Sequence, residues 1–259
     1  MFLTLSGADM SALIKGSGPH HVVVLNGWFG HAAGWGAFAD YLDLGNYTWH
    51  FWDYRGYGNR KDDAGEFTLE EISADIVAYI DSIEAEKVSI LGHSMGGVFM
   101  QKVLADSATP IASLVGISAV AAVGTPFDED SRKLFTSAGH NPDSRRAIID
   151  FTSGSRQPAA WLDDLTDSTV QNSTPEAVEK YFFAWADCNF AADLGTQDLP
   201  VYILTGDLDP AVTKTGVESA FGPIYKNLTV EELHDVGHYA IFEHPLGLAA
   251  RVLRFLDAV

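Results

Sequence analysis

The stretch ILGHSMGGVF (residues 90–99) decides the fold, because it places a serine in a glycine-rich turn between two apolar segments. The residues before the turn, VSIL, have the apolar character of a buried strand, and GVFMQ after it begins a helical pattern. A sharp strand–turn–helix connection projects the Ser94 hydroxyl above the edge of a sheet, as a nucleophilic serine requires. Gly92 and Gly96 suit this turn, because side chains at those positions would crowd the neighbouring strand and helix.

Segments with strand character alternate with helical segments along most of the 259 residues. This alternation predicts crossover connections and an α/β fold, with a mostly parallel central sheet flanked by helices. Helices are expected over residues 68–83 and 97–107 and after Pro245. Strands are expected at residues 2–6, 11–16, 21–27, 47–58 (running into a glycine-rich loop), 87–92, 111–119, 201–206 and 228–234.

Residues 125–195 interrupt this alternation. The segment contains SGSRQPAAW and STPEAVEKYFFAWADCNF, and Thr174 followed by Pro175 is a typical helix start. We therefore predict a helical cap (lid) insertion over residues 125–195. Residues 1–124 and 196–259 are then expected to form the core around the sheet.

Composition excludes several classes of partner. Asp and Glu outnumber Lys and Arg by 35 to 16, and a net charge of −19 repels phosphate backbones and anionic membranes. The single cysteine, Cys188, forms no internal disulfide, and the N-terminus lacks the basic region of a signal peptide. We expect a cytoplasmic protein that binds neither nucleic acid nor membranes. The oligomeric state is not predicted.

A serine needs a base and an orienting carboxylate to act as a nucleophile. The segment ILTGDLDPA supplies Asp207 and Asp209 just past a strand, and HDVGHYAIFEHP supplies His234 and His238 just past the last strand. The order is serine, acid, histidine. The two histidines do not form an HExxH motif, so we predict no metal site.

With these segments, the chain resembles the α/β-hydrolase fold family over nearly its whole length. The resemblance rests on NGWFGHAAGW, DYRGYG, GHSMGG, TGDLDP and VGHYAIFEHP. It implies that Ser94 is the nucleophile, that Asp209 is the acid, because the G-x-x-D pattern starts at Gly206, and that His238 is the base. The alternative acid position of some relatives is empty here, since no carboxylate follows LVGIS before Asp128. The resemblance implies no cofactor.

The resemblance also implies an oxyanion hole of two backbone N–H groups, those of Met95 and Trp28. Many family members have His-Gly where this chain has Asn26-Gly27. The N–H group survives that difference, so the role of Trp28 is kept. The shape of the loop beneath it is not predicted.

Aromatic residues of the insertion are candidates for an apolar substrate pocket: Trp161, Tyr181, Phe182 and Trp185. Val178, Tyr181, Phe182 and Trp185 also have the spacing of a helix's buried face, and the sequence leaves both interpretations open.

These residues together predict a serine hydrolase that cleaves a small, fairly apolar carboxylic ester or lactone through an acyl-enzyme. Two kinds of alternative stay open. Relatives with the same triad cleave C–C bonds, transfer acyl groups, make peracids or act as hydroxynitrile lyases. A chain with this fold and triad can also serve as a small-molecule receptor with little turnover.

Overall fold

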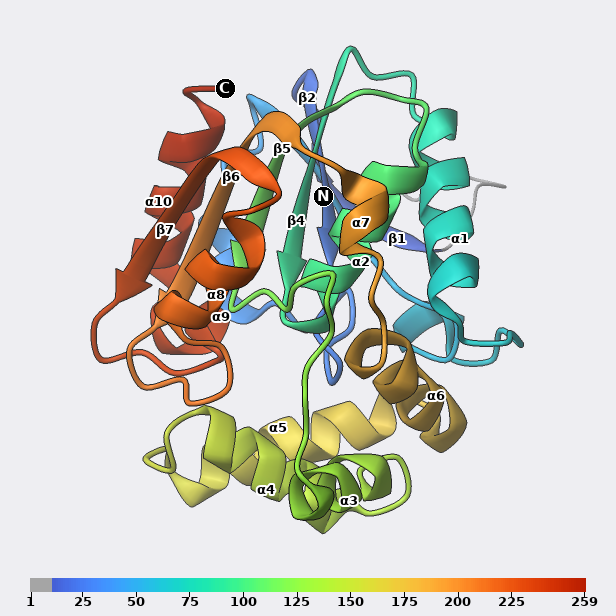
Figure 1. The fold of residues 1–259 in the computed structure, drawn as a ribbon, viewed down its shortest axis with the longest axis vertical. Helices are drawn as coiled ribbons and strands as arrows, with labels where there is room; N and C mark the ends of the chain where they lie inside the picture. The colour runs from blue at the N-terminus through green and yellow to red at the C-terminus, as the bar shows by residue number, and fades with distance from the viewer. Residues whose placement is uncertain (1–10) are drawn as a thin grey trace.

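A computed structural model describes residues 11–259 and contains a central sheet of seven strands (Figure 1). The strand order is β1-β3-β2-β4-β5-β6-β7, and all neighbours are parallel except β1 and β3. The strands are β1 (Ala12–Gly16), β2 (His20–Leu25), β3 (Tyr47–Trp52), β4 (Lys87–His93), β5 (Ile111–Ile117), β6 (Gln197–Gly206) and β7 (Tyr225–Leu233). The mostly parallel α/β sheet expected from the sequence is therefore confirmed. The strand expected at residues 2–6 lies outside the described residues.

Helices cover both faces of the sheet. One face packs against α1 (Leu69–Ser82), α2 (Met95–Asp106), α7 (Ala191–Leu194) and α8 (Lys214–Phe221). The other packs against the short 3₁₀ helix η1 (Gly36–Asp40) and against α9 (Ala240–Glu243) and α10 (Pro245–Leu256); a second 3₁₀ helix, η2, spans Gly58–Arg60. Strand β2 contributes to both cores: Val23 and Leu25 point to the first, and Val22 and Val24 to the second. Because both faces of β2 are buried, its residues 22–25 are all apolar.

Residues 125–195 contain five helices: α3 (Glu129–Ser137), α4 (Pro142–Thr152), α5 (Ala159–Gln171), α6 (Pro175–Ala186) and α7. Helices α3 to α6 gather beyond one end of the sheet in Figure 1, whereas α7 lies beside α2. Thr174 caps α6 by accepting a hydrogen bond from the N–H of Ala177, and Pro175 is the first helical residue, as predicted. The division of the chain at residues 125 and 195 remains a prediction.

Helix α8 was missed by the sequence analysis. Its eight residues include Gly216, and only Val217 and Phe221 are buried. Two buried apolar residues are too few for a helical period to be recognised. The capping signal was present, because the Thr213 hydroxyl accepts from the N–H of Gly216 at 3.2 Å.

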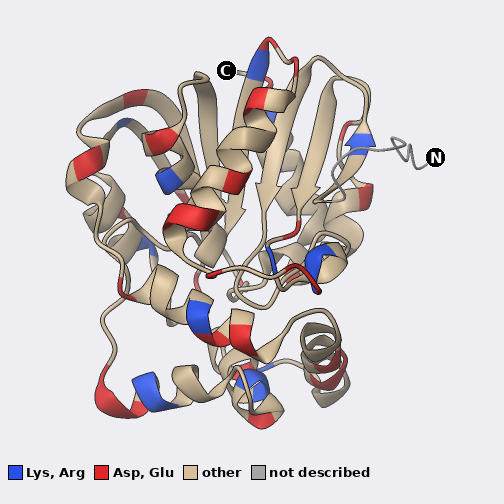
Figure 2. Cartoon of the chain, turned by 90° about the vertical axis from the view of Figure 1, so that its right-hand side faces the viewer, with Lys and Arg blue, Asp and Glu red and all other residues tan. Residues whose placement is uncertain are grey.

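The charged residues lie mainly on helices and loops, and the blue Lys and Arg segments are separated from one another (Figure 2). Among residues 11–259, no helix is long and apolar enough to cross a membrane.

Candidate active site

Ser94 stands between β4 and α2 in a backbone conformation that few non-glycine residues adopt, with φ +52° and ψ −116°. A Cβ atom on Gly92 would lie 2.4 Å from the carbonyl oxygen of Gly96, and one on Gly96 would lie 2.4 Å from that of Leu25. Side chains at these two positions would therefore collide with the backbone. The local sequence folds this way because only glycine permits the close approach.

The Ser94 backbone is fixed on both sides of the turn. Its N–H donates to the carbonyl of Ile117 at 3.0 Å, and its carbonyl accepts from the N–H groups of Gly97 at 2.8 Å and Val120 at 3.0 Å. These bonds tie the turn to the carboxyl end of β5. The Ser94 side chain lines a cavity above the sheet edge.

Asp209 lies on the loop after β6 and is 3% exposed. Its Oδ1 accepts from the N–H groups of Ala211 at 2.9 Å and Val212 at 3.1 Å. Its Oδ2 pairs with Nδ1 of His238 at 2.6 Å. Burial alone would raise the pKa of the Asp209 carboxyl, but the charge and hydrogen bond of His238 and the two N–H groups hold it below its ordinary value.

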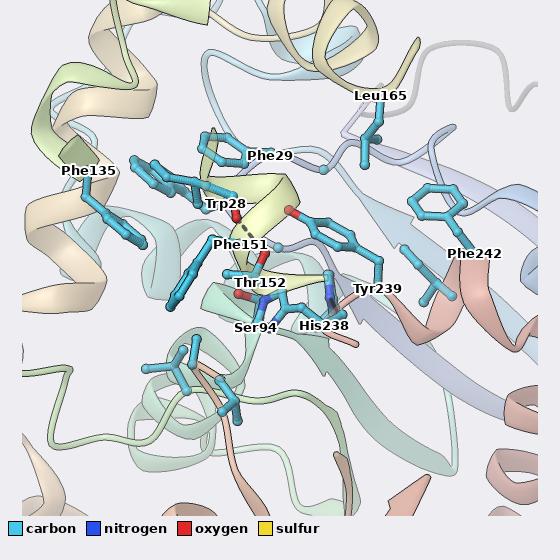
Figure 3. A pocket seen from close by; sticks show the side chains of 18 of the residues that line it. Trp28, Phe29, Ser94, Phe135, Phe151, Thr152, Leu165, His238, Tyr239 and Phe242 are labelled. Atoms are coloured by element: carbon cyan, nitrogen blue, oxygen red, sulfur yellow. Dashed lines mark hydrogen bonds between the residues drawn. The ribbon is translucent and has the colours of Figure 1, made fainter. Parts of the chain in front are cut away.

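An ionised carboxylate only accepts hydrogen bonds, so His238 donates from Nδ1 and its Nε2 is the basic nitrogen. His238 and Ser94 both line the cavity, and Figure 3 shows them together at its base. Within residues 11–259, no hydrogen bond joins the Ser94 hydroxyl to His238; in enzymes without substrate this bond is often long or poorly aligned. The structure thus brings together the three side chains that the sequence singled out.

His93 supports His238 from the elbow. Its Nε2–H donates to the backbone carbonyl of His238 at 3.0 Å, and the two rings are 5.2 Å apart. Burial, with the nearby His238, lowers the pKa of His93 to about 3, so its ring is neutral at pH 7. His93 therefore supports the backbone of His238 and takes no proton itself at pH 7.

The rival residues Asp207 and His234 form a pair of their own. His234 Nδ1 lies 2.6 Å from Oδ2 of Asp207, and the two side chains are 95% and 25% exposed. Neither lines the cavity with Ser94. The structure therefore separates two His–Asp pairs whose members lie close together in the sequence.

The loop after β2 passes over Ser94, since a Cβ on Gly27 would lie 3.3 Å from the Ser94 Cβ. The carbonyls of Asn26 and Trp28 accept hydrogen bonds from Tyr54 at 3.0 Å and Tyr57 at 2.9 Å. Met95 is the first residue of α2, so its N–H has no acceptor within the helix. The loop that carries Trp28 and the start of α2 therefore both lie at the elbow, and the assignment of the Trp28 and Met95 N–H groups to an oxyanion hole remains a prediction.

Asn26, where many family members have His, fixes the loop through its side chain. Its Nδ2 donates to the carbonyl of Trp52 at 2.5 Å, and its Oδ1 accepts from Nε1 of Trp35 at 2.6 Å. Asn26 therefore links the loop to β3 and to the segment before η1. These contacts explain the asparagine at this position, and they involve residues too distant in the sequence to be recognised from it.

The cavity has a volume of about 640 Å³, within the usual range for small-molecule sites. Its lining is largely apolar and comes from the core loops and from the insertion (Figure 3). Aromatic residues make up much of it: Trp28, Phe29, Phe127, Phe135, Phe151, Trp161, Trp185, Tyr239 and Phe242.

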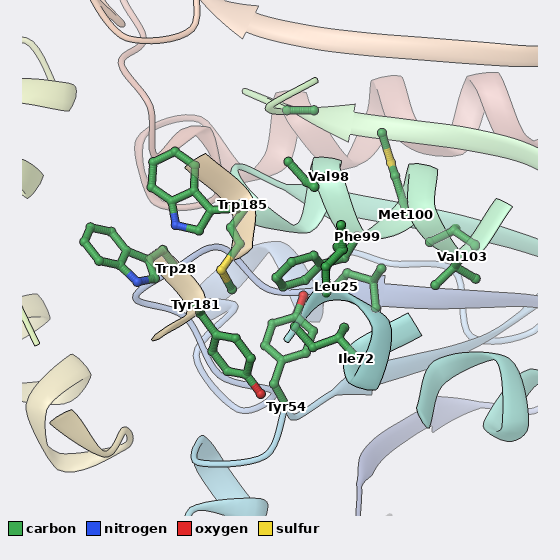
Figure 4. Close-up of a cluster of buried hydrophobic side chains, with 14 of the residues drawn as sticks. Leu25, Trp28, Tyr54, Ile72, Val98, Phe99, Met100, Val103, Tyr181 and Trp185 are labelled. Carbon is green, nitrogen blue, oxygen red and sulfur yellow. The ribbon is translucent and has the colours of Figure 1, made fainter. Parts of the chain in front are cut away.

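Of the four candidate pocket residues, Trp161 and Trp185 line the cavity, whereas Tyr181 and Phe182 do not. The latter two are fully buried in the core, where Tyr181 packs beside Tyr54 and Phe99 (Figure 4). The Tyr181 hydroxyl donates to the carbonyl of Arg55 at 3.0 Å. Assigning these two residues to the pocket was wrong, because this face of α6 packs on the core.

Thr152 and Tyr239 are among the polar residues of the cavity that the sequence analysis did not assign. Tyr239 follows His238 directly, and this adjacency was an available signal. Thr152 lies 86 residues before His238, and no pattern joins the two. No group of three or more His, Cys, Asp or Glu side chains that would hold a metal ion occurs within residues 11–259.

The amino-acid sequence is similar to those of known proteins. Residues 22–251 match the sequence profile described as the alpha/beta hydrolase family. The 3-oxoadipate enol-lactonase 2 of Acinetobacter baylyi is 21% identical over 164 residues, which span 62% of this chain and 61% of that protein. The chain thus covers about three fifths of that relative.

Two solved structures have the same fold over nearly their whole length. An esterase from Exiguobacterium antarcticum superposes with a TM-score of 0.84 and 19% identity, covering 95% of each chain. A bromoperoxidase from Bacillus anthracis superposes with a TM-score of 0.83 and 20% identity, covering 95% of this chain and 94% of that one. At these identities the likeness concerns the fold.

Proposed function

Because the chain belongs to the alpha/beta hydrolase family, we propose that it is a serine hydrolase that cleaves an apolar carboxylic ester or lactone. The observation that carries this proposal is the buried His238–Asp209 pair, whose histidine lines the same cavity as the strained Ser94. A buried carboxylate that accepts a hydrogen bond from Nδ1–H keeps the neutral imidazole in one tautomer and leaves the Nε2 lone pair for proton transfer. Names of an esterase and an enol-lactonase among similar proteins support this reaction class.

In the proposed reaction, Nε2 of His238 takes the Ser94 proton while Oγ attacks the carbonyl carbon. The N–H groups of Trp28 and Met95 stabilise the resulting oxyanion. The intermediate collapses as His238 donates the proton to the leaving alkoxide, which departs as the alcohol. Water then gives a proton to His238 and attacks the acyl-enzyme; when this second intermediate collapses, His238 returns the proton to Ser94 Oγ and the acid is released. In a lactone, the alcohol and the acid are parts of one product.

The cavity supports the proposed substrate class. Apolar aromatic walls favour an apolar acid or alcohol moiety, and the volume suits a small organic molecule. The reaction needs no cofactor. The cytoplasmic location and the role of residues 125–195 as a cap remain predictions from the sequence.

The decisive measurement is intact mass after incubation with a fluorophosphonate, on the wild type and on Ser94→Ala. One adduct on the wild type and none on the variant is the expected result. No adduct on folded wild type would contradict the hydrolase proposal. A panel of p-nitrophenyl esters and lactones then separates a hydrolase, with steady-state turnover, from a receptor, with a single-turnover burst only.

A further inference from the structure

The turn that joins α4 to α5 reaches back to the loop that carries His238. We call residues 152–157 the docking turn; they belong to the insertion. The carbonyl of Thr152 accepts a hydrogen bond from the backbone N–H of His238 at 3.1 Å. Since His93 donates to the His238 carbonyl, the backbone of this histidine is held by the insertion on one side and by the elbow on the other.

Glu243 holds the residues on both sides of His238. Its Oε2 accepts from the N–H of Gly237 at 2.9 Å, and its Oε1 accepts from the N–H of Tyr239 at 3.1 Å. The side chain of Glu243 is only 5% exposed. One carboxylate thus fixes the backbone immediately before and after the proposed base.

The docking turn orients this carboxylate. Arg156 Nη2 donates to Oε2 of Glu243 at 2.6 Å, and Gln157 Nε2 donates to the same oxygen at 2.9 Å. Arg156 Nη2 also donates to the carbonyl of Asp235 at 2.8 Å, three residues before His238. Arg156 therefore contacts the His238 loop at two separate points.

The two backbones also touch, because a Cβ on Gly237 would lie 2.7 Å from the Cα of Ser153. Such an approach leaves no room for water or for a side chain between the turn and the loop. The docking turn is thus packed against the His238 loop as well as hydrogen-bonded to it.

We propose that Arg156 and Gln157 are positioning residues. They act through Glu243 to hold the His238 imidazole where its Nε2 can take the proton of Ser94. This inference rests on the proposed function, since it assigns the insertion a part in catalysis. A displacement of about 1 Å in a catalytic group can reduce the rate about 100-fold. Removing the Arg156 guanidinium also leaves Glu243 as a buried carboxylate without a cation, which favours rearrangement of the loop.

The test compares Arg156→Met with Arg146→Met. Arg146 forms an ion pair of similar length with Asp163 at 2.7 Å, also within residues 125–195, and within residues 11–259 it has no hydrogen bond or ion pair with the His238 loop. We expect Arg156→Met to lower kcat about 10-fold, with KM changed less than about twofold. Arg146→Met should leave both constants unchanged, and Arg156→Lys should recover part of the lost kcat.

Two further readouts separate positioning from simple stabilisation. The rate at which the fluorophosphonate labels Ser94 should fall in Arg156→Met but not in Arg146→Met, and the ring resonances of His238 in NMR spectra should shift, when both variants are measured well below their own thermal unfolding transitions. Equal kcat, labelling rate and His238 resonances in the two variants would overturn the inference while leaving the proposed function intact. A wild type that is not labelled would overturn the proposed function, and this inference with it.

Discussion

Two His–Asp pairs lie on the same two loops, and they have the same bond length but different surroundings. His238–Asp209 and His234–Asp207 each join Nδ1 to Oδ2 at 2.6 Å. The side chains of the first pair are 8% and 0% exposed, whereas those of the second are 95% and 25% exposed. Only His238 of the two histidines lines the cavity with Ser94.

Hydrogen-bond geometry alone therefore does not identify a catalytic pair. Water screens the exposed pair and competes for its hydrogen bond, so that pair contributes little to stability or reactivity. Burial strengthens the interaction within the other pair and fixes the ring. The nearby serine then gives the second ring nitrogen a reaction partner.

The largest expected difference is between His238→Ala and His234→Ala. Removing the proposed base should lower kcat/KM for a p-nitrophenyl ester by about 10⁴-fold or more, because Ser94 then has no proton acceptor. His234→Ala should stay within about twofold of the wild type, since its side chain projects into solvent. A comparable loss in both variants would mean that the surface pair takes part in catalysis.

A slightly smaller contrast is expected between Asp209→Asn and Asp207→Asn. An amide at residue 209 presents a donor to Nδ1 and favours the wrong tautomer of His238, which should lower kcat about 10³- to 10⁴-fold. Asp207→Asn is the matched control and should retain nearly full activity. Steady-state kinetics at pH 7 measure both, and full activity of Asp209→Asn would remove residue 209 from the mechanism.

The dependence of stability on pH should depend on the buried His93, which contacts the His238 loop, more than on the exposed His234–Asp207 pair. The pKa of His93 is lowered to about 3 from 6.5, so between these values the unfolded chain binds a proton that the folded chain does not. The stability that comes from keeping this ring neutral is present above pH 6.5 and is lost as the pH falls. For His93 this loss is about 2 kcal/mol at pH 5 relative to pH 8.

Urea denaturation at pH 5 and pH 8 measures this difference. His93→Gln should lose less stability between the two pH values than the wild type. His234→Gln, a substitution in the exposed pair, should keep the wild-type dependence. An unchanged dependence in His93→Gln would show that its ring is not held neutral by burial.

The smallest expected effect is the loss of stability when the hydrogen bond of the exposed pair is weakened. Asp207→Asn should change the free energy of unfolding by no more than about 1 kcal/mol, and the change should shrink in high salt. Urea denaturation at low and high ionic strength is the measurement. A loss above about 2 kcal/mol would show that the surface pair has a structural role that its exposure does not suggest.

Much of the fold was predictable because the signals are local. The apolar run of β2, the capping threonine of α6 and the contact of Gly92 with Gly96 each involve neighbours a few residues away. The short helix α8 carried too few apolar residues to be recognised. Tyr181 and Phe182 have a helical apolar pattern that is the same whether the face meets a cavity or a core.

By itself, the sequence determined the α/β alternation, the serine turn and the order of serine, acid and histidine. The tertiary structure decided that Asp207 and His234 form a separate pair at the surface, which face of α6 meets the core, and that the docking turn contacts the His238 loop. The physical reason is distance along the chain. Backbone propensity and side-chain period depend on near neighbours, whereas contacts such as Arg156 with Glu243, 87 residues apart, exist only after long-range packing.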